Sequence, residues 1–223
     1  MEVLSMNIKK VLMAVTLLVG VLSGCSGKNP EKQLYTTFEN TASKEKLLVN
    51  NKKKLEHLET KTQELYSQIL QDGKENNESV TGKIDQAMAN IDEREKIINK
   101  EKDLLENEQK KVKSSQSYID KIKDGELKKQ ANKVKESYEK RYQSFAKINE
   151  NYVNLLKEEK QLFEKLKTKE TNLKEITEKV NAVNKLNSEI QKEKENFNTI
   201  TQEYNAAKLN FYRGANIQVK EEK

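Results

Sequence analysis

The sequence predicts an all-α fold, an elongated up-and-down four-helix bundle with coiled-coil-like packing. Two observations carry this prediction. The 223 residues include one proline and seven glycines, whereas 35% are Asp, Glu, Lys or Arg. Proline and glycine mark loops and sheets, so their scarcity favours long helices with short connections. Apolar residues also recur at helical spacing, which decides against the disorder that so polar a composition otherwise indicates.

The N-terminal residues predict an export signal. Lys9 and Lys10 precede the uncharged run 11–22, which is too short to span a membrane permanently. The run ends in Leu22-Ser23-Gly24-Cys25, in which Cys25 is the only cysteine of the chain. This tetrapeptide resembles the lipobox of bacterial lipoproteins, in which the thiol receives a diacylglycerol and the chain is cut before it. An ordinary secretory signal with a chance cysteine is the alternative, but position, spacing and small residues favour lipidation.

The predicted organisation follows from this cut: a cleaved signal peptide over 1–24, a lipidated tether over 25–29, a bundle domain over 30–213 and a loose tail over 214–223. Removal of residues 1–24 takes away two lysines and one glutamate, so the net charge falls from +6 to +5. The single thiol is expected to be acylated. No disulfide is then available, and helix packing alone must hold the exported domain together.

Four helices of similar length are predicted, over about 30–71, 80–122, 126–167 and 171–212. Asn29-Pro30-Glu31 is a typical helix start, and a polar turn at Gly73 ends the first apolar stripe. No glycine or proline marks the third turn. As a single helix, residues 126–212 would leave half of their apolar face without a partner, so we place a reversal near residues 168–172.

The second predicted helix has the most regular apolar pattern, with six residues spaced seven apart: Ile84, Ile91, Ile98, Leu105, Val112 and Ile119. A strict seven-residue repeat keeps one face against a partner helix. The positions three residues further on include Arg94, Glu101 and Glu108. We expect these three side chains to face solvent, if the bundle is self-contained, or to line an open groove that accepts a partner helix.

The sequence predicts no enzyme, with no catalytic residue, cofactor or metal site. Motifs such as HExxH, paired cysteines or a glycine-rich phosphate loop do not occur in it. The one histidine, His57, lies in a charged helical segment and is expected on the surface. Acidic pairs such as Glu158 with Glu159, or Glu106 with Glu108, are expected on solvated faces.

Aromatic residues gather in two segments, 138–152 and 197–212. An up-and-down bundle brings both segments to one end. We predict an aromatic-filled end of the core, and the alternative is an amphipathic surface that stacks sugars or a peptide.

Basic residues concentrate between Lys110 and Arg141, where eleven cations stand against five carboxylates. The topology places the turn at Gly125 at the same pole as residue 30, next to the lipid anchor. An acyl anchor with a polybasic patch is a two-signal arrangement for membrane binding. We predict contact with the anionic membrane surface or with polyanions, the alternative being a merely solvated turn. The candidate contact residues are Lys121, Lys123, Lys128, Lys129, Lys133 and Lys135.

The lipobox at Leu22-Ser23-Gly24-Cys25, followed by one lysine- and glutamate-rich helical domain, resembles the YkyA-like cell-wall-binding lipoproteins of low-GC Gram-positive bacteria. The resemblance covers essentially the whole chain, and the lipobox is its one specific motif. It implies a four-helix up-and-down bundle that is anchored on the extracytoplasmic face of the cell membrane. It supplies no site residue beyond Cys25.

The predicted function is that of a non-enzymatic surface lipoprotein, which binds or organises the cell envelope through anionic wall polymers or peptidoglycan. Its partners are then the lipid bilayer, through the acylated cysteine, and wall polymers, whereas nucleic acid is not expected outside the cell. The alternative is a helical adaptor that docks or regulates a protein partner such as a wall hydrolase. A solute-binding lipoprotein is excluded because it needs a two-lobed α/β fold.

Overall fold

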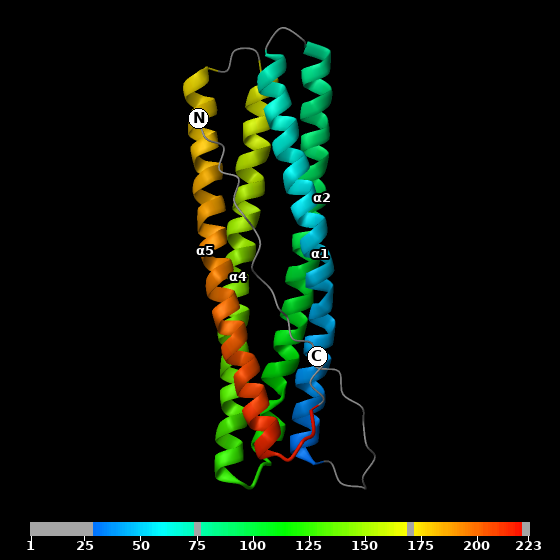
Figure 1. Cartoon of the computed structure of the whole chain (residues 1–223), viewed down its shortest axis with the longest axis vertical. Coiled ribbons are helices and arrows are strands. Elements are labelled where there is room, and N and C mark those ends of the chain that lie inside the picture. The colour runs from blue at the N-terminus through cyan, green and yellow to red at the C-terminus, as the bar shows by residue number, and fades with distance from the viewer. Residues whose placement is uncertain (1–28, 74–76, 169–171, 220–223) are drawn as a thin grey trace.

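The computed structural model describes residues 29–73, 77–168 and 172–219, and these residues form an all-α bundle (Figure 1). No strand occurs in these three ranges. The predicted all-α helical bundle is therefore confirmed. The helices are α1 (Pro30–Asp72), α2 (Asn77–Ser114), α3 (Gln116–Ile119), α4 (Gly125–Lys167) and α5 (Leu173–Gly214).

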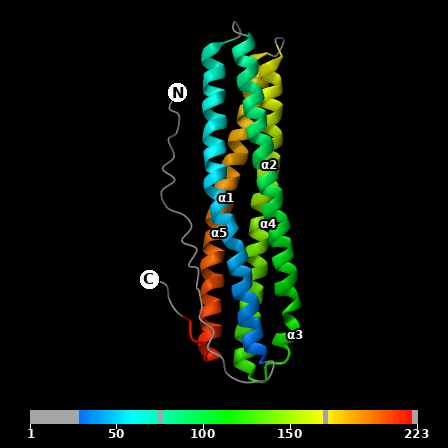
Figure 2. The same cartoon turned by 90° about the vertical axis from the view of Figure 1, so that its right-hand side faces the viewer.

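The four long helices run up and down along one axis and give the molecule two poles (Figures 1 and 2). The lower pole holds the start of α1, the short helix α3, the turn into α4 and the end of α5 (Figure 2). The contacts between helices pair α1 with α2, α4 with α5, and α2 with α4. The bundle thus consists of two helical hairpins, α1–α2 and α4–α5, which meet mainly along α2 and α4.

Polar caps fix the starts of three long helices. The Asn29 side-chain oxygen accepts a hydrogen bond from the Glu31 N–H at 2.9 Å, and that of Asp124 accepts one from the Glu126 N–H at 2.9 Å. Asn172 does the same for α5, where its oxygen lies 3.0 Å from the Glu175 nitrogen. The chain reverses between α4 and α5, close to the segment in which burial alone suggested a turn. Such caps satisfy N–H groups that have no partner within the helix.

The helix expected over 80–122 is interrupted at Ser115, and the expectation of one continuous helix is wrong there. The Ser114 hydroxyl donates to the Lys111 carbonyl at 2.8 Å, and the Ser115 hydroxyl donates to the Val112 carbonyl at 2.6 Å. These hydroxyls compete with the backbone for carbonyl oxygens and loosen the helical pattern. The apolar face nevertheless continues, because Ile119 and Ile122 remain buried.

The interior consists of two apolar clusters, one toward each pole. The lower cluster joins residues of all the helices, including Leu34, Val112 and Phe211, and the upper one includes Ile84, Ile91 and Leu155. All six residues of the seven-residue repeat are buried. The face of α2 that the sequence predicted to lie against a partner helix is therefore part of the core.

Beyond α5, the chain does not leave the bundle at once. Ala215, Ile217 and Val219 pack against the lower cluster, and the Ile217 N–H donates to the Tyr212 carbonyl at 2.8 Å. The expected loose tail over 214–223 is thus corrected for residues 215–219, because their apolar side chains cover the end of the core. The predicted signal peptide over 1–24 and residues 25–28 of the tether lie outside the described residues.

Candidate functional site

The predicted lipidation site lies outside the described residues, as do the residues before it: Cys25, Leu22, Ser23 and Gly24. Within the described ranges, no helix is long and apolar enough to cross a membrane. The same ranges hold no group of three or more His, Cys, Asp or Glu side chains placed to bind a metal ion.

The six candidate lysines all lie at the lower pole but on different faces of it. Lys121 and Lys123 are exposed next to the turn into α4, and the other four occupy the first turns of that helix. The Lys128 and Lys135 ammonium groups reach the segment before α4, where they donate to the Asp120 carbonyl at 3.2 Å and to the Gln116 side chain at 2.8 Å. Lys129 and Lys133 are exposed on another face. The structure therefore gathers these residues at one pole without making them a single contact face.

Carboxylates neutralise little of this charge. Among the six lysines, Lys135 alone lies within ion-pair distance of a carboxylate of the described chain, that of Glu139 at 3.9 Å. The Lys121 ammonium lies 5.9 Å from the Tyr118 ring centroid, a cation–π contact that leaves the charge in place. The pole presents five lysines whose charge remains available to anions.

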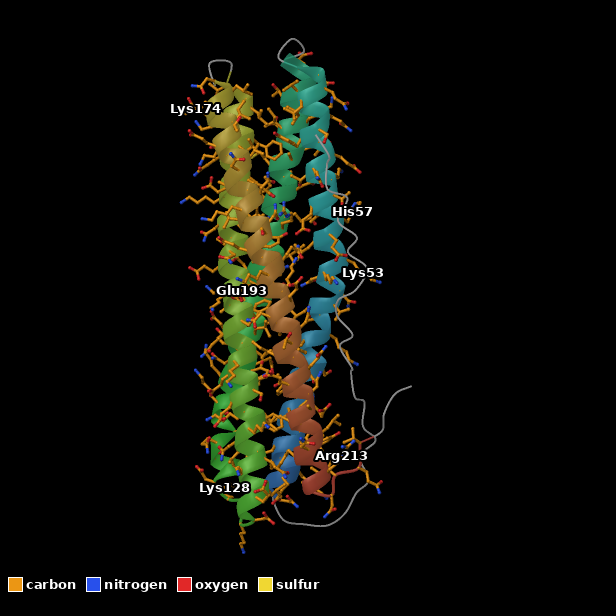
Figure 3. The ribbon with its side chains drawn as sticks, turned by 60° about the vertical axis from the view of Figure 1, so that its left-hand side comes forward. Lys53, His57, Lys128, Lys174, Glu193 and Arg213 are labelled. Carbon is orange, nitrogen blue, oxygen red and sulfur yellow. The ribbon has the colours of Figure 1, made fainter. Side chains whose placement is uncertain are left out.

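A groove of about 1370 Å³ runs between α4 and α5 from the lower pole. We call it the α4–α5 groove; Lys128 and Arg213 mark its lower end in Figure 3. Its charged lining comprises five cations and three carboxylates: Lys128, Lys129, Lys133, Lys140, Arg213, Glu126, Glu136 and Glu203. Sequence reasoning missed Lys140 and Arg213 as site residues. Their signal was present, since Lys140 belongs to the basic segment and Arg213 ends the helix that returns to this pole.

The polar side chains of α2 neither face solvent nor line an open groove, so the sequence expectation for them is wrong. Arg94, Glu101 and Glu108 are 1%, 6% and 2% exposed, respectively. They occupy core positions because partners on neighbouring helices satisfy them. Glu108, for example, accepts a hydrogen bond from the buried Thr41 hydroxyl at 3.1 Å.

Arg94 is the centre of a buried polar cluster. Its guanidinium donates to Glu159 at 2.6 Å and to the Tyr152 oxygen at 2.9 Å, and the Tyr152 hydroxyl donates to Glu59 at 2.5 Å. Burial by itself lowers the pKa of Arg94, but the charge of Glu159 and its other acidic neighbours raises the pKa above the usual value. Burial raises the pKa of Glu159, against the attraction of Arg94. The cluster joins α1, α2 and α4.

Two further ionic clusters join the hairpins below it. Glu45 of α1 lies 2.7 Å from the guanidinium of Arg141 on α4. Glu39, nearer the start of α1, accepts from the Lys208 ammonium at 3.1 Å and from the Tyr212 hydroxyl at 2.8 Å, both on α5. Burial and the adjacent Glu39 raise the pKa of Tyr212, so that its hydroxyl remains a donor.

Acidic pairs were also expected on solvated faces, and this is wrong for one member of each pair. Glu159 is nearly buried against Arg94, and Glu108 is buried between α1 and α2. Interhelical partners, which sequence spacing does not reveal, hold both carboxylates inside. His57 lies on the exposed side of α1, as expected (Figure 3).

The two aromatic segments meet inside the bundle, as predicted, but Tyr152 belongs to the upper cluster, so the aromatic residues do not all lie at one end of the core. Tyr138 and Tyr204 lie 5.4 Å apart between ring centroids, and Phe145 and Phe197 lie 6.2 Å apart. The Arg141 guanidinium lies 4.7 Å from the Phe197 ring centroid, so the aromatic contacts and the ionic clusters interlock.

The fold and these surfaces define a class of protein: an elongated helical bundle with buried ion pairs and a basic pole. The chain belongs to the YkyA family, whose model matches residues 29–214 and is described as "Putative cell-wall binding lipoprotein". A curated relative from Bacillus subtilis (strain 168), named "Uncharacterized lipoprotein YkyA", is 26% identical over 200 residues, which are 90% of each chain. No solved structure matches the chain.

Glu101 gives a testable pH dependence. Burial raises its pKa from 4.5 to about 7, and the hydrogen bond from Asn51 and the charge of Lys194 oppose that rise. An acid with a raised folded-state pKa stabilises the fold while it is protonated. This contribution is complete below about pH 4.5 and is lost as the pH rises to about 7. Over that range we predict that the free energy of unfolding of the wild type falls by about 3 kcal/mol. In Glu101→Gln, which has no carboxyl group at this position, we predict that this fall is absent.

Urea denaturation on either side of this pH range measures the effect. Asp103→Asn, on an exposed position of the same helix, is the control and is expected to keep the pH dependence of the wild type. An unchanged pH profile in Glu101→Gln would show that Glu101 ionises freely in the folded protein.

Proposed function

We propose that this lipoprotein binds anionic polymers of the cell wall through its lower pole, while a lipid on Cys25 holds it to the outer face of the cell membrane. One observation carries the proposal: five lysines without a carboxylate partner lie at the pole where α1 begins. Lysines in that state attract anions without first breaking an internal pair. The family description, which names cell-wall binding, agrees with this proposal.

The proximity of the pole to the anchor supports the same function. Four residues lie between Cys25 and Pro30, so the five Cα-to-Cα steps of the linking chain span at most about 18 Å. This is roughly two Debye lengths at physiological ionic strength. At full extension of the linking chain, attraction to the membrane surface has largely decayed at the pole, whereas polymers that pass through the space next to the membrane reach the lysines directly. We therefore favour wall polymers, rather than the membrane surface, as the anionic ligand.

The buried charges support a non-catalytic role. Arg94, Arg141 and Lys208 each bind a carboxylate inside the bundle, where they stabilise helix packing. The adaptor alternative depended on an open face at Arg94, Glu101 and Glu108. Since these side chains are buried, that face offers no docking site for a partner helix.

Removal of three lysine charges at the lower pole tests the proposal. We predict that Lys123→Gln/Lys129→Gln/Lys133→Gln lowers binding to purified wall sacculi about tenfold at low salt, because each exposed charge contributes up to about 1 kcal/mol. Co-sedimentation of the detergent-extracted protein measures binding, with sacculi that retain or lack their anionic polymers. Binding of the wild type should weaken at high salt and disappear with the polymers.

The matched control is Lys61→Gln/Lys157→Gln/Lys174→Gln, which removes the same charge from exposed positions in the upper half of the bundle. Lys174 lies at the upper pole in Figure 3. An equal loss in both triple variants would mean that net charge alone, and not the lower pole, determines binding. Equal binding of the wild type to stripped and intact sacculi would contradict the proposed ligand.

The anchor has its own test. We predict that Cys25→Ala releases the protein from membranes and leaves the helical content unchanged, because the buried residues of both core clusters lie between Leu34 and Tyr212. Membrane flotation in high salt and circular dichroism measure the two outcomes. A variant that still floats with membranes in high salt would contradict lipid anchoring.

A further inference from the structure

The α4–α5 groove extends along the side of the bundle rather than across its tip. Glu126 and Lys140 lie 14 residues apart on α4, which corresponds to about 21 Å of helix. Gly214 lies against Leu127 and Gln130, and the Arg141 guanidinium donates to the Thr201 hydroxyl at 2.9 Å. Arg213 is therefore near the lower end of the groove, and Glu203 is near its upper end. A groove of this length along the side of the bundle fits an extended chain better than a flat membrane surface.

The charged groups of the groove are not paired with one another. No ion pair of the described residues involves any of the five cations or three carboxylates, although several lie one helical turn apart. Glu136 and Lys140, for example, are at i and i+4, the spacing at which Lys135 and Glu139 approach to 3.9 Å. Charges of both signs therefore line one concave surface and remain available to a ligand.

The signs are interspersed along the groove. Glu126 and Arg213 lie at the lower end, then come Lys129 and Lys133, then Glu136, and finally Lys140 with Glu203. A pure polyanion would meet repulsion from the carboxylates, and an uncharged glycan would use none of the charges. The lining suits a ligand that has anionic and cationic groups along one chain and a net negative charge.

Neutral polar groups complete the lining. Ser137 and Asn210 contribute hydroxyl and amide groups to the lining. Ala206 and Ala207 contribute only small methyl side chains on the α5 side.

We propose that the α4–α5 groove binds a polyol phosphate chain that carries aminoacyl esters. Its phosphodiesters pair with Lys129, Lys133 and Arg213, and its free ammonium groups pair with Glu136 and Glu203. This inference rests on the proposed function, because it takes wall polymers as the ligand class, and it names the chemical form that the protein prefers.

The inference and simple charge attraction predict opposite effects of the aminoacyl esters on affinity. Aminoacyl esters reduce the net negative charge of the polymer, so plain electrostatic attraction predicts weaker binding of the esterified chain. We expect instead that the wild-type protein, purified with its lipid in nonionic detergent, binds the esterified chain about fivefold more tightly than the same chain after mild alkaline removal of the esters. Isothermal titration calorimetry with both preparations measures the two affinities.

Glu136→Gln/Glu203→Gln sharpens the test. This variant gains two positive charges, so net charge alone predicts tighter binding of both polymers. Our inference predicts about fivefold weaker binding of the esterified chain and tighter binding of the bare chain. The control is Glu64→Gln/Glu178→Gln, with the same gain in charge at exposed positions in the upper half, which should leave the preference for esters unchanged.

The outcomes separate this inference from the function on which it rests. Weaker binding of the esterified chain to the wild type, with tighter binding of both chains to Glu136→Gln/Glu203→Gln, would overturn the inference and leave polyanion binding intact. Failure of the wild type to bind either chain would overturn both. A variant that loses only the preference for the esterified chain would support the inference.

Discussion

The buried charges between the two hairpins are the constraint on which the rest of this structure depends. Glu39, Glu45 and Glu59 lie along one helix, and each contacts a cation or tyrosine of the other hairpin. An unpaired charge in such an interface is strongly destabilising, whereas a paired one is close to neutral against an apolar replacement. The clusters therefore contribute more to register than to net stability. A shift of α1 by one turn, about 5.4 Å, would separate all three acids from their partners.

Two groups of charged residues can be distinguished, those paired inside the bundle and those left unpaired on its surface. The interior holds Arg94, Arg141 and Lys208 each against a carboxylate, where they are shielded from solvent. The lysines of the lower pole and the charges of the α4–α5 groove are left without such partners. In a chain so rich in Lys and Glu, charge alone does not distinguish a binding surface. The concentration of five unpaired lysines at one pole of the described structure does, and it directs attention to the pole where α1 begins.

Much of the fold followed from periodicity. The repeat that starts at Ile84 identified a buried face correctly, and burial arguments placed the reversal before Leu173 where no glycine or proline marks it. Arg94 was misjudged because a charged residue at a core position resembles a surface residue until its partner is known. That partner, Glu159, is 65 residues away, and only the packing of α2 on α4 brings it near.

The α4–α5 groove was missed for a related reason, because segments of α4 and α5 that are far apart in the chain form it together. The break at Ser115 depends on side-chain hydrogen bonds that apolar spacing does not record.

A double-mutant cycle at Arg141 and Glu45 tests this account most directly, because the pair links α4 to α1 and is nearly buried. Arg141→Met and Glu45→Met should each lower the free energy of unfolding by about 3 kcal/mol, and the double variant should recover at least about 2 kcal/mol relative to their sum. The exposed pair Lys54–Glu93 is the comparison and should couple by less than about 1 kcal/mol. If the losses at Arg141 and Glu45 are additive, so that their coupling energy is no larger than that of the exposed pair, the result would contradict an interface that is set by buried charge.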